Sequence, residues 1–471
     1  MTWRILTITA FACGVAWAQQ KPNFVFVFSD DVNRDSWGVY GNPDCQTPHI
    51  DRLARQGLLF EKAYCSVAMC GPFRQELYSG RTPWRTGTLA NHSKSSPDTK
   101  SLPHYLGPLG YRVALIGKSH VGPKSAYPFD TVDGVKDNND KFVAAAAKII
   151  DESVDQGQGF CLFLASSDGH APFTTGDPSA YPPDKLTIPP YWLDTPELRE
   201  NLSKYYAEVT HFDALVGKTH ALLEAKGQLE NTLLMVCTEQ GAQLPFGKWT
   251  CFDNGLHMGL IAHWPKRIQA GALAPQLISL MDVAPTLVEL AGGELKPGDM
   301  DGRSMVSVLD GEPGIINDYV FGAFTNCNII DNRERIYPIR SIRDSRYTLL
   351  WCPNYEDLTS NVTLTNALGL IDGKSKSESS HGKGDIAMSW VKRMKKGERA
   401  EFLVKRLFHR PEYALYDRRS DPLEETNLAA DPKHRETLER LSRALHERLK
   451  ELGDENPVAT ETELAKMRKQ K

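Results

Sequence analysis

Four short hydrophobic runs stand out along the chain, and each ends abruptly in polar or ionisable residues. Runs of this length that are apolar at consecutive positions are typical of strands buried on both faces of a parallel sheet. They are NFVFVFSDD (23–31), YRVALIGKSH (111–120), GFCLFLASSDGH (159–170) and NTLLMVCTEQG (231–241).

Between these runs, apolar residues recur at helical spacing. Such segments are 47–57, 140–157 and 198–228, the last with Gly227 as a plausible stop. Buried strands that alternate with amphipathic helices predict an α/β fold, with a large, mostly parallel or mixed central sheet flanked by helices. Ligand sites in such sheets lie at the carboxyl ends of the strands, where all four polar clusters fall.

The pattern changes from about residue 320. Residues 337–352 predict a hairpin with its turn at Asp344-Ser345, and 414–432 a last short strand and a turn. Residues 371–399, rich in Gly, Ser and Lys, are typical of a loop or insertion. Residues 433–453 predict a charged helix with an apolar stripe of leucines.

These patterns divide the chain into four parts. We predict a signal peptide, a catalytic domain, a smaller carboxy-terminal α+β domain and a polar tail, at residues 1–18, 19–325, 326–455 and 456–471. The first segment has Arg4, an apolar stretch and Ala16-Trp17-Ala18, the order found in secretory signals; a buried amino-terminal strand is the alternative. We therefore expect a secreted or periplasmic protein.

Composition excludes some classes of partner. The 471 residues are 41% hydrophobic and carry a net charge of −4, which gives no electrostatic basis for binding nucleic acid. After the first segment no apolar run is long enough to span a membrane. Eight scattered cysteines follow the signal, without zinc spacing and without the density of a disulfide framework.

The polar ends of the strands supply the residue types of an anion and metal site. Asp30 and Asp31 repel each other and need a cation or a turn to hold them, and hard oxygen ligands of this kind suit Ca²⁺ or Mg²⁺. The remaining candidates are basic, imidazole, carboxylate or amide side chains: Lys118, His120, His170, Glu239, Gln240 and Lys248. Together they suit a doubly charged oxyanion beside a divalent cation.

One loop is unusual, Cys70-Gly71-Pro72-Phe73-Arg74, followed by Ser79-Gly80-Arg81. With NFVFVFSDD, LGYRVALIGKSHVGP and ALYDRRSDPLEETNLAADP, this loop resembles the sulfatase family of the alkaline-phosphatase superfamily. The segments KSHVGPKSAYPFD and YPIRS are similar to its sulfamidase branch, which acts on N-sulfoglucosamine. The resemblance extends in order over nearly the whole mature chain.

The resemblance implies roles for individual residues. Cys70 is the residue that a maturation enzyme oxidises to formylglycine, an aldehyde whose hydrate attacks sulfur, and Arg74 stabilises it. Lys118 and Lys248 contact the sulfate, His120 takes a proton from the hydrate, and His170 protonates the leaving group. The implied Ca²⁺ ligands are Asp30, Asp31, Cys70, Glu239 and Gln240.

The sequence departs from the family pattern at two places. Phe73 replaces a small polar residue, but the maturation system reads mainly Cys, Pro and Arg. Glu239-Gln240 replaces the usual Asp-Asn or Asp-His, which keeps the donor types but lengthens each side chain.

For the substrate we expect a sulfated saccharide that loses an O- or N-sulfate. Candidate contacts in the surrounding loops are Arg85, His92, Tyr337 and Arg340. Two alternatives stay open: a phosphate or phosphonate monoester hydrolase of the same superfamily, and an inactive glycan-binding relative. Cys70 with Arg74 and Lys118 favours the sulfatase.

Overall fold

In the computed structural model, the described residues are 21–469 except 137, 326–328, 331–332, 335, 360, 362, 373–384 and 397. The signal segment predicted at residues 1–18 therefore lies outside the described residues. Among those described, no helix is both long and apolar enough to cross a membrane.

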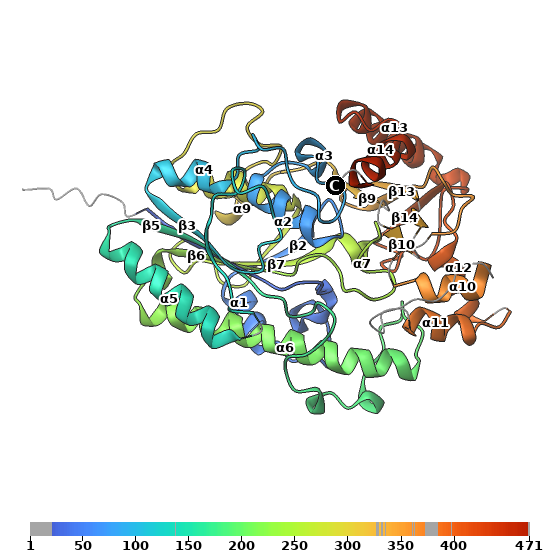
Figure 1. Cartoon of the computed structure of the whole chain (residues 1–471), viewed down its shortest axis with the longest axis horizontal. Coiled ribbons are helices and arrows are strands. Elements are labelled where there is room, and N and C mark those ends of the chain that lie inside the picture. Colours follow the sequence, from blue (N-terminus) through green and yellow to red (C-terminus); the bar gives the residue numbers. More distant parts are fainter. Residues whose placement is uncertain are drawn as a thin grey trace, which may run out of the picture.

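The centre of the molecule is an eight-stranded sheet with the order β4-β3-β5-β1-β6-β7-β2-β8 (Figure 1). Its strands are β1 (Asn23–Phe28), β2 (Leu58–Tyr64), β3 (Tyr111–Gly117), β4 (Asp130–Val132), β5 (Gly159–Ala165), β6 (Thr232–Cys237), β7 (His257–His263) and β8 (Ala272–Ser279). The four hydrophobic runs form β1, β3, β5 and β6, which pair in parallel. The predicted α/β fold is confirmed.

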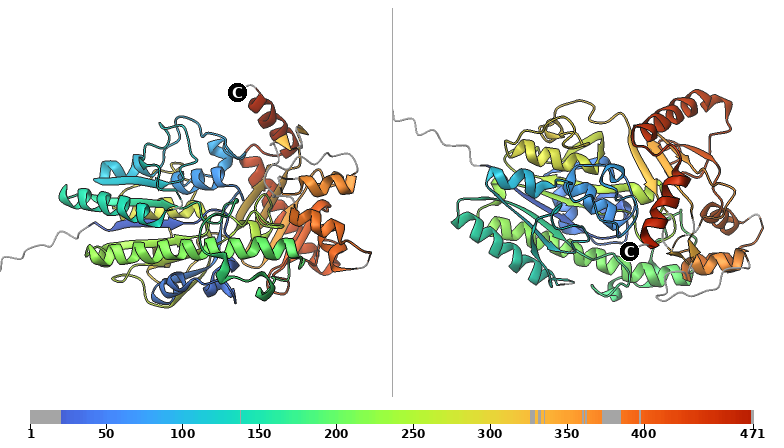
Figure 2. Two further views of the ribbon diagram at one scale, coloured as in Figure 1. Left: turned by 60° about the horizontal axis from the view of Figure 1, so that its bottom comes forward. Right: turned by 45° about the horizontal axis from the view of Figure 1, so that its top comes forward.

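Helices cover both faces of this sheet, as Figures 1 and 2 show. One layer holds α1 (Pro48–Gln56), α5 (Asn139–Asp155) and α6 (Pro196–Ala225), and the other α2 (Cys70–Ser79), α4 (Leu102–Leu106), α8 (Val283–Leu290) and α9 (Val306–Leu309). The short helices α3 (Pro83–Thr86) and α7 (Asp253–Leu256) lie in loops between these elements. Every residue of β1 and β6 is buried, which explains their unbroken apolar sequences.

A second, antiparallel sheet follows, with the order β14-β13-β12-β9. Its strands are β9 (Val320–Phe324), β12 (Ile339–Arg343), β13 (Tyr347–Trp351) and β14 (Tyr413–Asp417), and a two-stranded ribbon comprises β10 (Ile329–Ile330) and β11 (Arg333–Glu334). The hairpin predicted around Asp344-Ser345 is β12–β13. Because β9 pairs with β12, this sheet begins before residue 326, the start that we predicted for the second domain.

Helices surround the second sheet. They are α10 (Thr365–Asp372), α11 (Asp385–Lys392), α12 (Arg399–Phe408), α13 (Arg435–Glu451) and α14 (Pro457–Lys469). Leu441, Leu445 and Leu449 bury the predicted stripe of α13 against the sheet. The described parts of the predicted loop 371–399 include α11, whose apolar face is buried.

The segment predicted as a polar tail from residue 456 forms the helix α14. Asp454 and Glu461 are buried and face the guanidinium of Arg340, at 2.5 Å from Nε and 3.6 Å from NH1 respectively. One carboxylate just before α14 and one within it thus compensate the buried charge of Arg340 in the second sheet.

Candidate active site

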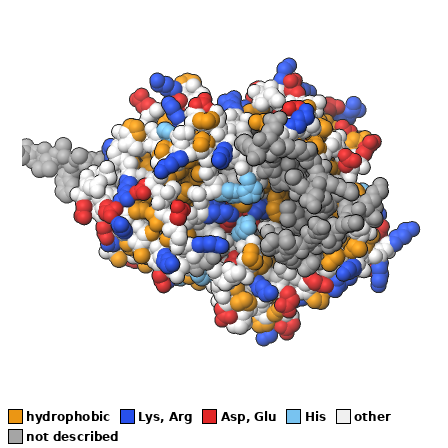
Figure 3. Space-filling view, in the orientation of Figure 1, with side chains coloured by type: hydrophobic (Ala, Val, Ile, Leu, Met, Phe, Trp, Pro, Cys, Tyr) orange, Lys and Arg blue, Asp and Glu red, His pale blue; other side chains and the backbone are white. Residues whose placement is uncertain are grey.

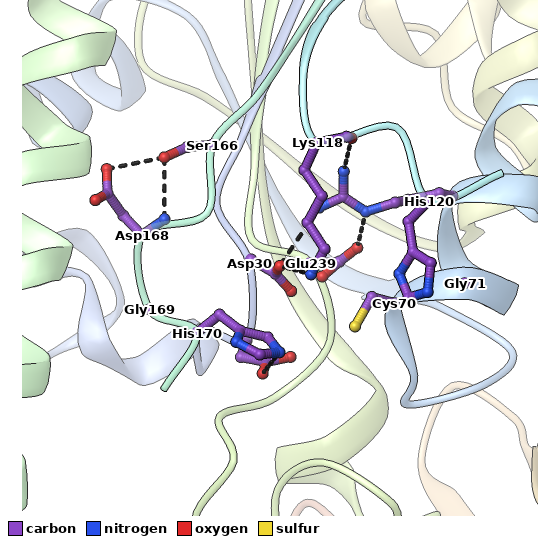
Figure 4. A network of polar contacts seen from close by, with 12 residues as sticks. Asp30, Cys70, Gly71, Lys118, His120, Ser166, Asp168, Gly169, His170 and Glu239 are labelled. Atoms are coloured by element: carbon purple, nitrogen blue, oxygen red, sulfur yellow. Dashed lines mark hydrogen bonds and ion pairs between the residues drawn. The ribbon is translucent and has the colours of Figure 1, made fainter. Parts of the chain in front are cut away.

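The candidate residues at the strand ends meet at one edge of the large sheet (Figure 4). Asp30 and Asp31 follow β1, Lys118 follows β3, His170 follows β5, and Glu239 follows β6. Lys118 and His170 line a pocket of about 880 Å³, whose wall also includes Cys70 at the start of α2. On this face of the molecule, histidine side chains gather around lysine and arginine side chains (Figure 3). The sequence prediction of one cluster at this edge agrees with the structure.

Cys70 is the first residue of α2 and is only 1% exposed. Its Sγ lies 3.3 Å from Nζ of Lys248. Burial raises the pKa of the thiol to about 12 in spite of this lysine, so the group is a neutral thiol at neutral pH. A neutral thiol is a poor nucleophile, and the unmodified side chain is therefore unsuited to thiolate catalysis.

Glycine fits closely against a neighbouring loop directly after Cys70. A Cβ at Gly71 would lie 3.1 Å from Oδ1 of Asn91 and 3.3 Å from the backbone nitrogen of His92, both closer than ordinary van der Waals contact. The Gly71 N–H also donates to Oδ1 of Asn91. The Asn91–His92 loop can therefore close over the start of α2, beside Cys70.

Arg74 lies one helical turn after Cys70 and is fully buried. Its Nε donates to Oε1 of Glu239 at 2.7 Å, and NH2 lies 3.7 Å from Oδ2 of Asp30. Another guanidinium nitrogen donates to the carbonyl of Lys118. Arg74 thus joins α2 to the ends of three strands. The intervening Phe73 points away, against Phe28 in the core, at 6.1 Å between ring centroids.

The carboxylates form a candidate metal centre. One ligand atom from each of Asp30, Asp31, Cys70 and Glu239 lies within 4.8 Å of all the others. Three buried oxygens here, Oδ1 of Asp30, Oε2 of Glu239 and Oε1 of Gln240, have no hydrogen-bond donor among the described residues. Unpaired buried acceptors of this kind are costly unless a cation or water satisfies them. The residues present therefore fit a hard divalent cation.

The carboxylates of this candidate metal centre lie among basic side chains, which affect their pKa values. Burial alone would raise the pKa of Asp30, but Lys118 and the other cations nearby hold it well below its usual range. Burial raises the pKa of Glu239 well above its usual range, although Arg74 opposes the shift. Lys118 donates to Asp30, and Lys248 donates to Asp31 at 2.7 Å. Each of the three carboxylates therefore has a cationic partner, and the case for a divalent cation rests on the unpaired buried oxygens.

The turn after β5 aims His170 at this cluster. Ser166 donates to Oδ2 of Asp168 at 2.8 Å, and Gly169 has φ +93° (Figure 4). A Cβ at Gly169 would lie 2.3 Å from the backbone oxygen of Asp30, so only glycine allows this approach. His170 Nδ1 bonds the carbonyl of Ala171 at 2.8 Å, which leaves Nε2 facing the pocket, 3.8 Å from Oδ2 of Asp31. Burial lowers its pKa.

His120 and His92 form a pair on the opposite side of the pocket, with Nε2 of His120 2.8 Å from Nδ1 of His92. Burial, reinforced by Lys118, lowers the pKa of His120 to about 3, so the ring is neutral and able to accept a proton. Asp31, His92, His120 and Trp249 all have φ between 50° and 65°. Strained backbone of this kind in non-glycine residues clusters at functional sites.

The four predicted substrate contacts differ in whether they line the pocket. His92 lines the pocket, but Arg85, Tyr337 and Arg340 are absent from the wall that the described residues form. Arg85 pairs with Asp301 at 2.6 Å, whereas Tyr337 and Arg340 are 2% and 0% exposed. Arg340 is a structural ion-pair partner of Asp454, and its prediction as a substrate contact is wrong.

The pocket also contains residues that the sequence analysis missed, namely Asp133, Lys136, Ser167, Gln243 and Trp249. Gln243 is 7% exposed, and its Nε2 has no acceptor among the described residues. Its position three residues after Gln240 was the available signal. A buried amide donor in the wall of a pocket is suited to an oxygen of a bound ligand.

A sheet edge with this set of cations, carboxylates and imidazoles defines a hydrolase site for an oxyanion. Residues 22–293 match the family model described as Sulfatase, and 241–362 match N-sulphoglucosamine sulphohydrolase, C-terminal. An ulvan-active sulfatase of Formosa agariphila is 31% identical over 92% of this chain and 81% of its own. Human N-sulphoglucosamine sulphohydrolase is 27% identical over 89% and 88%. The chain therefore belongs to the sulfatase family, and it is a sulfuric ester hydrolase.

Solved structures share the fold. One, in complex with its substrate D-glucosamine-2-N,6-O-disulfate, has a TM-score of 0.69 and 18% identity over 93% of this chain and 99% of its own. A phosphonate monoester hydrolase from Silicibacter pomeroyi has a TM-score of 0.65 and 18% identity over 91% and 95%. Since hydrolysis of sulfate groups and of phosphonate monoesters both occur on this fold, the fold alone does not determine which of the two an enzyme hydrolyses.

Proposed function

We propose that this chain is a formylglycine-dependent sulfatase that removes an O- or N-sulfate from a sulfated saccharide. The principal support is the setting of Cys70: a buried, neutral thiol 3.3 Å from Lys248, inside the Cys-Gly-Pro-Phe-Arg loop and beside a carboxylate cluster. Oxidation by a maturation enzyme would convert this side chain to an aldehyde. Its hydrate has one hydroxyl to attack sulfur and another whose deprotonation releases sulfate.

The surrounding side chains bind the sulfate, position residue 70 and transfer protons. Lys118 and Lys248 hold the sulfate oxygens, and Arg74 fixes the position of residue 70 from one helical turn away. His170 would give a proton to the departing alcohol or amine from Nε2 of its doubly protonated ring, a form that Asp31, 3.8 Å away, favours against the effect of burial. His120 is kept neutral by burial and accepts the proton of the second hydroxyl.

Asp30, Asp31, Glu239 and Gln240 would hold one Ca²⁺, which polarises sulfate oxygens when bound. Removal of this ion with a chelator is expected to abolish sulfate release. It is also expected to lower the free energy of unfolding by about 2–4 kcal/mol. The reference is protein in a Ca²⁺ concentration about 100–1,000 times the dissociation constant of the ion. Both effects should reverse when Ca²⁺ is added, as followed by sulfate release and thermal unfolding. Full activity in protein shown by elemental analysis to be metal-free would contradict the site.

The proposal of a saccharide rests on the relatives and on the pocket wall. The relatives named above act on ulvan and N-sulphoglucosamine, and this pocket combines Trp249 with the amide of Gln243. An aromatic face and a polar donor suit a sugar ring and its hydroxyls. Co-expression with a formylglycine-generating enzyme, followed by a screen of N- and O-sulfated saccharides for released sulfate, tests the proposal. No release from any saccharide, with Cys70 fully converted, would refute it.

Replacing Gln243 by alanine tests the sugar contact. A lost hydrogen bond of about 0.5–1.5 kcal/mol predicts a fall of about 2- to 10-fold in kcat/KM for the saccharide. The value for a small aryl sulfate should not change, because that substrate lacks the sugar. Gln269→Ala, at an exposed glutamine, is the control. An equal fall for both substrates would show that Gln243 acts on the catalytic groups instead.

We also propose that residues 1–18 direct export. Sequencing the amino terminus of protein recovered from the cell exterior or periplasm tests this proposal. Cleavage after Ala18 is the expected result, whereas an intact Met1 in cytoplasmic protein would refute it.

A further inference from the structure

A second pocket, of about 740 Å³, lies between the loops of the two sheets. From the large sheet and its loops, its wall includes Arg34, Lys62, Tyr64, Asp253 and His257. From the second sheet, it includes Arg346, Arg418 and Arg419, near the ends of β12 and β14. Among the described residues, none of its wall residues lines the active-site pocket. Its volume falls within the range of about 300–1,000 Å³ that small-ligand sites occupy.

Of the three carboxylates in the described wall of this pocket, one has basic partners within the protein. Oδ2 of Asp253 lies 2.8 Å from Nδ1 of His257, and its Oδ1 lies 3.3 Å from Arg343. Asp35 accepts a hydrogen bond of 2.7 Å from the hydroxyl of Tyr191. Glu61, at an exposed position, is the remaining carboxylate of the wall.

The basic groups, in contrast, outnumber their acidic partners. Arg418 donates to the carbonyls of Tyr347 and Asp344 and to the hydroxyl of Thr348, all of them neutral acceptors. Arg346 is paired with Asp417 at 2.6 Å, whereas neither Lys62 nor Arg419 has an ion-pair partner in the described part of the chain.

Arg34 completes this set. Its guanidinium carbon lies 3.8 Å from the ring centroid of Tyr40, and its buried Nε has no hydrogen-bond acceptor among the described residues. The pocket thus has an excess of positive charge, much of it on guanidinium groups that are already held in place. Guanidinium groups match the paired oxygens of sulfate and carboxylate groups.

We infer that this pocket is a second binding site for a sulfated saccharide chain, which it holds through sulfate groups of residues that are not being hydrolysed. The inference rests on the proposed function for the identity of the ligand, but the site is built from different residues. A second attachment point on one chain would raise the effective concentration of a polymeric substrate at the active site. It would leave small substrates unaffected.

The test combines calorimetry and kinetics. A sulfated hexasaccharide is titrated into Cys70→Ala protein, which cannot turn it over, and two binding events are expected. The double variant Lys62→Glu/Arg419→Glu should lose one event, with an affinity at least about tenfold lower, because hydrogen bonds to charged groups contribute about 1.5–3 kcal/mol each. In converted enzyme the same substitutions should raise KM for a sulfated polymer and leave KM for an aryl sulfate unchanged.

Arg435→Glu/Lys466→Glu is the matched control, since it makes the same charge change at side chains that are 80% and 61% exposed elsewhere. The inference is overturned by a single binding event in the Cys70→Ala protein, by an equal loss in the control, or by equal binding of the desulfated hexasaccharide. The inference would also be overturned if inorganic sulfate bound this pocket as tightly as the hexasaccharide, because the pocket would then be a site for a free anion. Two binding events in the Cys70→Ala protein, together with no sulfate release by parent enzyme whose Cys70 is fully converted, would support the site and refute the proposed function.

Discussion

Cys70→Ala is expected to reduce sulfate release by at least about 10⁴-fold, because loss of a covalent nucleophile removes a reaction route and not merely a contact. The other described cysteines are buried and outside the pocket wall. Initial rates of sulfate release from the best saccharide of the screen, at equal protein concentration, provide the measurement.

Cys65→Ala is the matched control for this prediction. Cys65 is also a buried, free cysteine, five residues earlier in the same segment, but it does not line the pocket. Its replacement should leave the rate within about twofold of the parent protein, since small changes in stability do not alter transition-state binding. Substantial activity in Cys70→Ala would exclude a nucleophile at this position.

Asp454→Ala is expected to lower the free energy of unfolding by about 3–5 kcal/mol, the usual cost of leaving one partner of a buried ion pair uncompensated. Asp454 is 1% exposed and accepts hydrogen bonds from Arg340 at 2.5 Å and from Trp84 Nε1 at 2.7 Å. Its loss would leave the fully buried guanidinium of Arg340 with Glu461, 3.6 Å away, as its remaining carboxylate partner. Denaturant unfolding measures the change.

Glu455→Ala, at the exposed neighbouring carboxylate, should change the free energy of unfolding by less than about 0.5 kcal/mol. The triple variant Arg340→Met/Asp454→Leu/Glu461→Gln should recover most of the loss, because it removes the buried cation together with both carboxylates that face it. If Asp454→Ala behaved like Glu455→Ala, the buried pair would not hold the carboxy-terminal segment to the second sheet.

Much of the large sheet could be predicted because its signal is local. Each of β1, β3, β5 and β6 is a continuous apolar run, and parallel strands must present their carboxyl ends at one edge. The residues directly after those ends, such as Asp30 and Lys118, therefore had to converge. The position of Cys70 came from the resemblance, and the structure adds that burial keeps its thiol neutral.

The errors occur where the decisive contact is distant in sequence. Arg340 follows a tyrosine-proline segment and resembles a polar loop residue, but its partner Asp454 is 114 residues away. No local pattern indicates that the two are buried together. Without that pair, the segment of α14 also looks like a solvated tail. Gln243 and Trp249 were missed because they lie in a loop of irregular backbone, where no periodicity assigns a side chain to the pocket.

The first measurement should be the mass of the tryptic peptide Ala63–Arg74 from protein made alongside a formylglycine-generating enzyme. The mechanism predicts that Cys70 loses one sulfur and two hydrogens and gains one oxygen, while Cys65 in the same peptide stays unchanged. An unmodified Cys70 in protein that nevertheless releases sulfate would contradict the formylglycine mechanism.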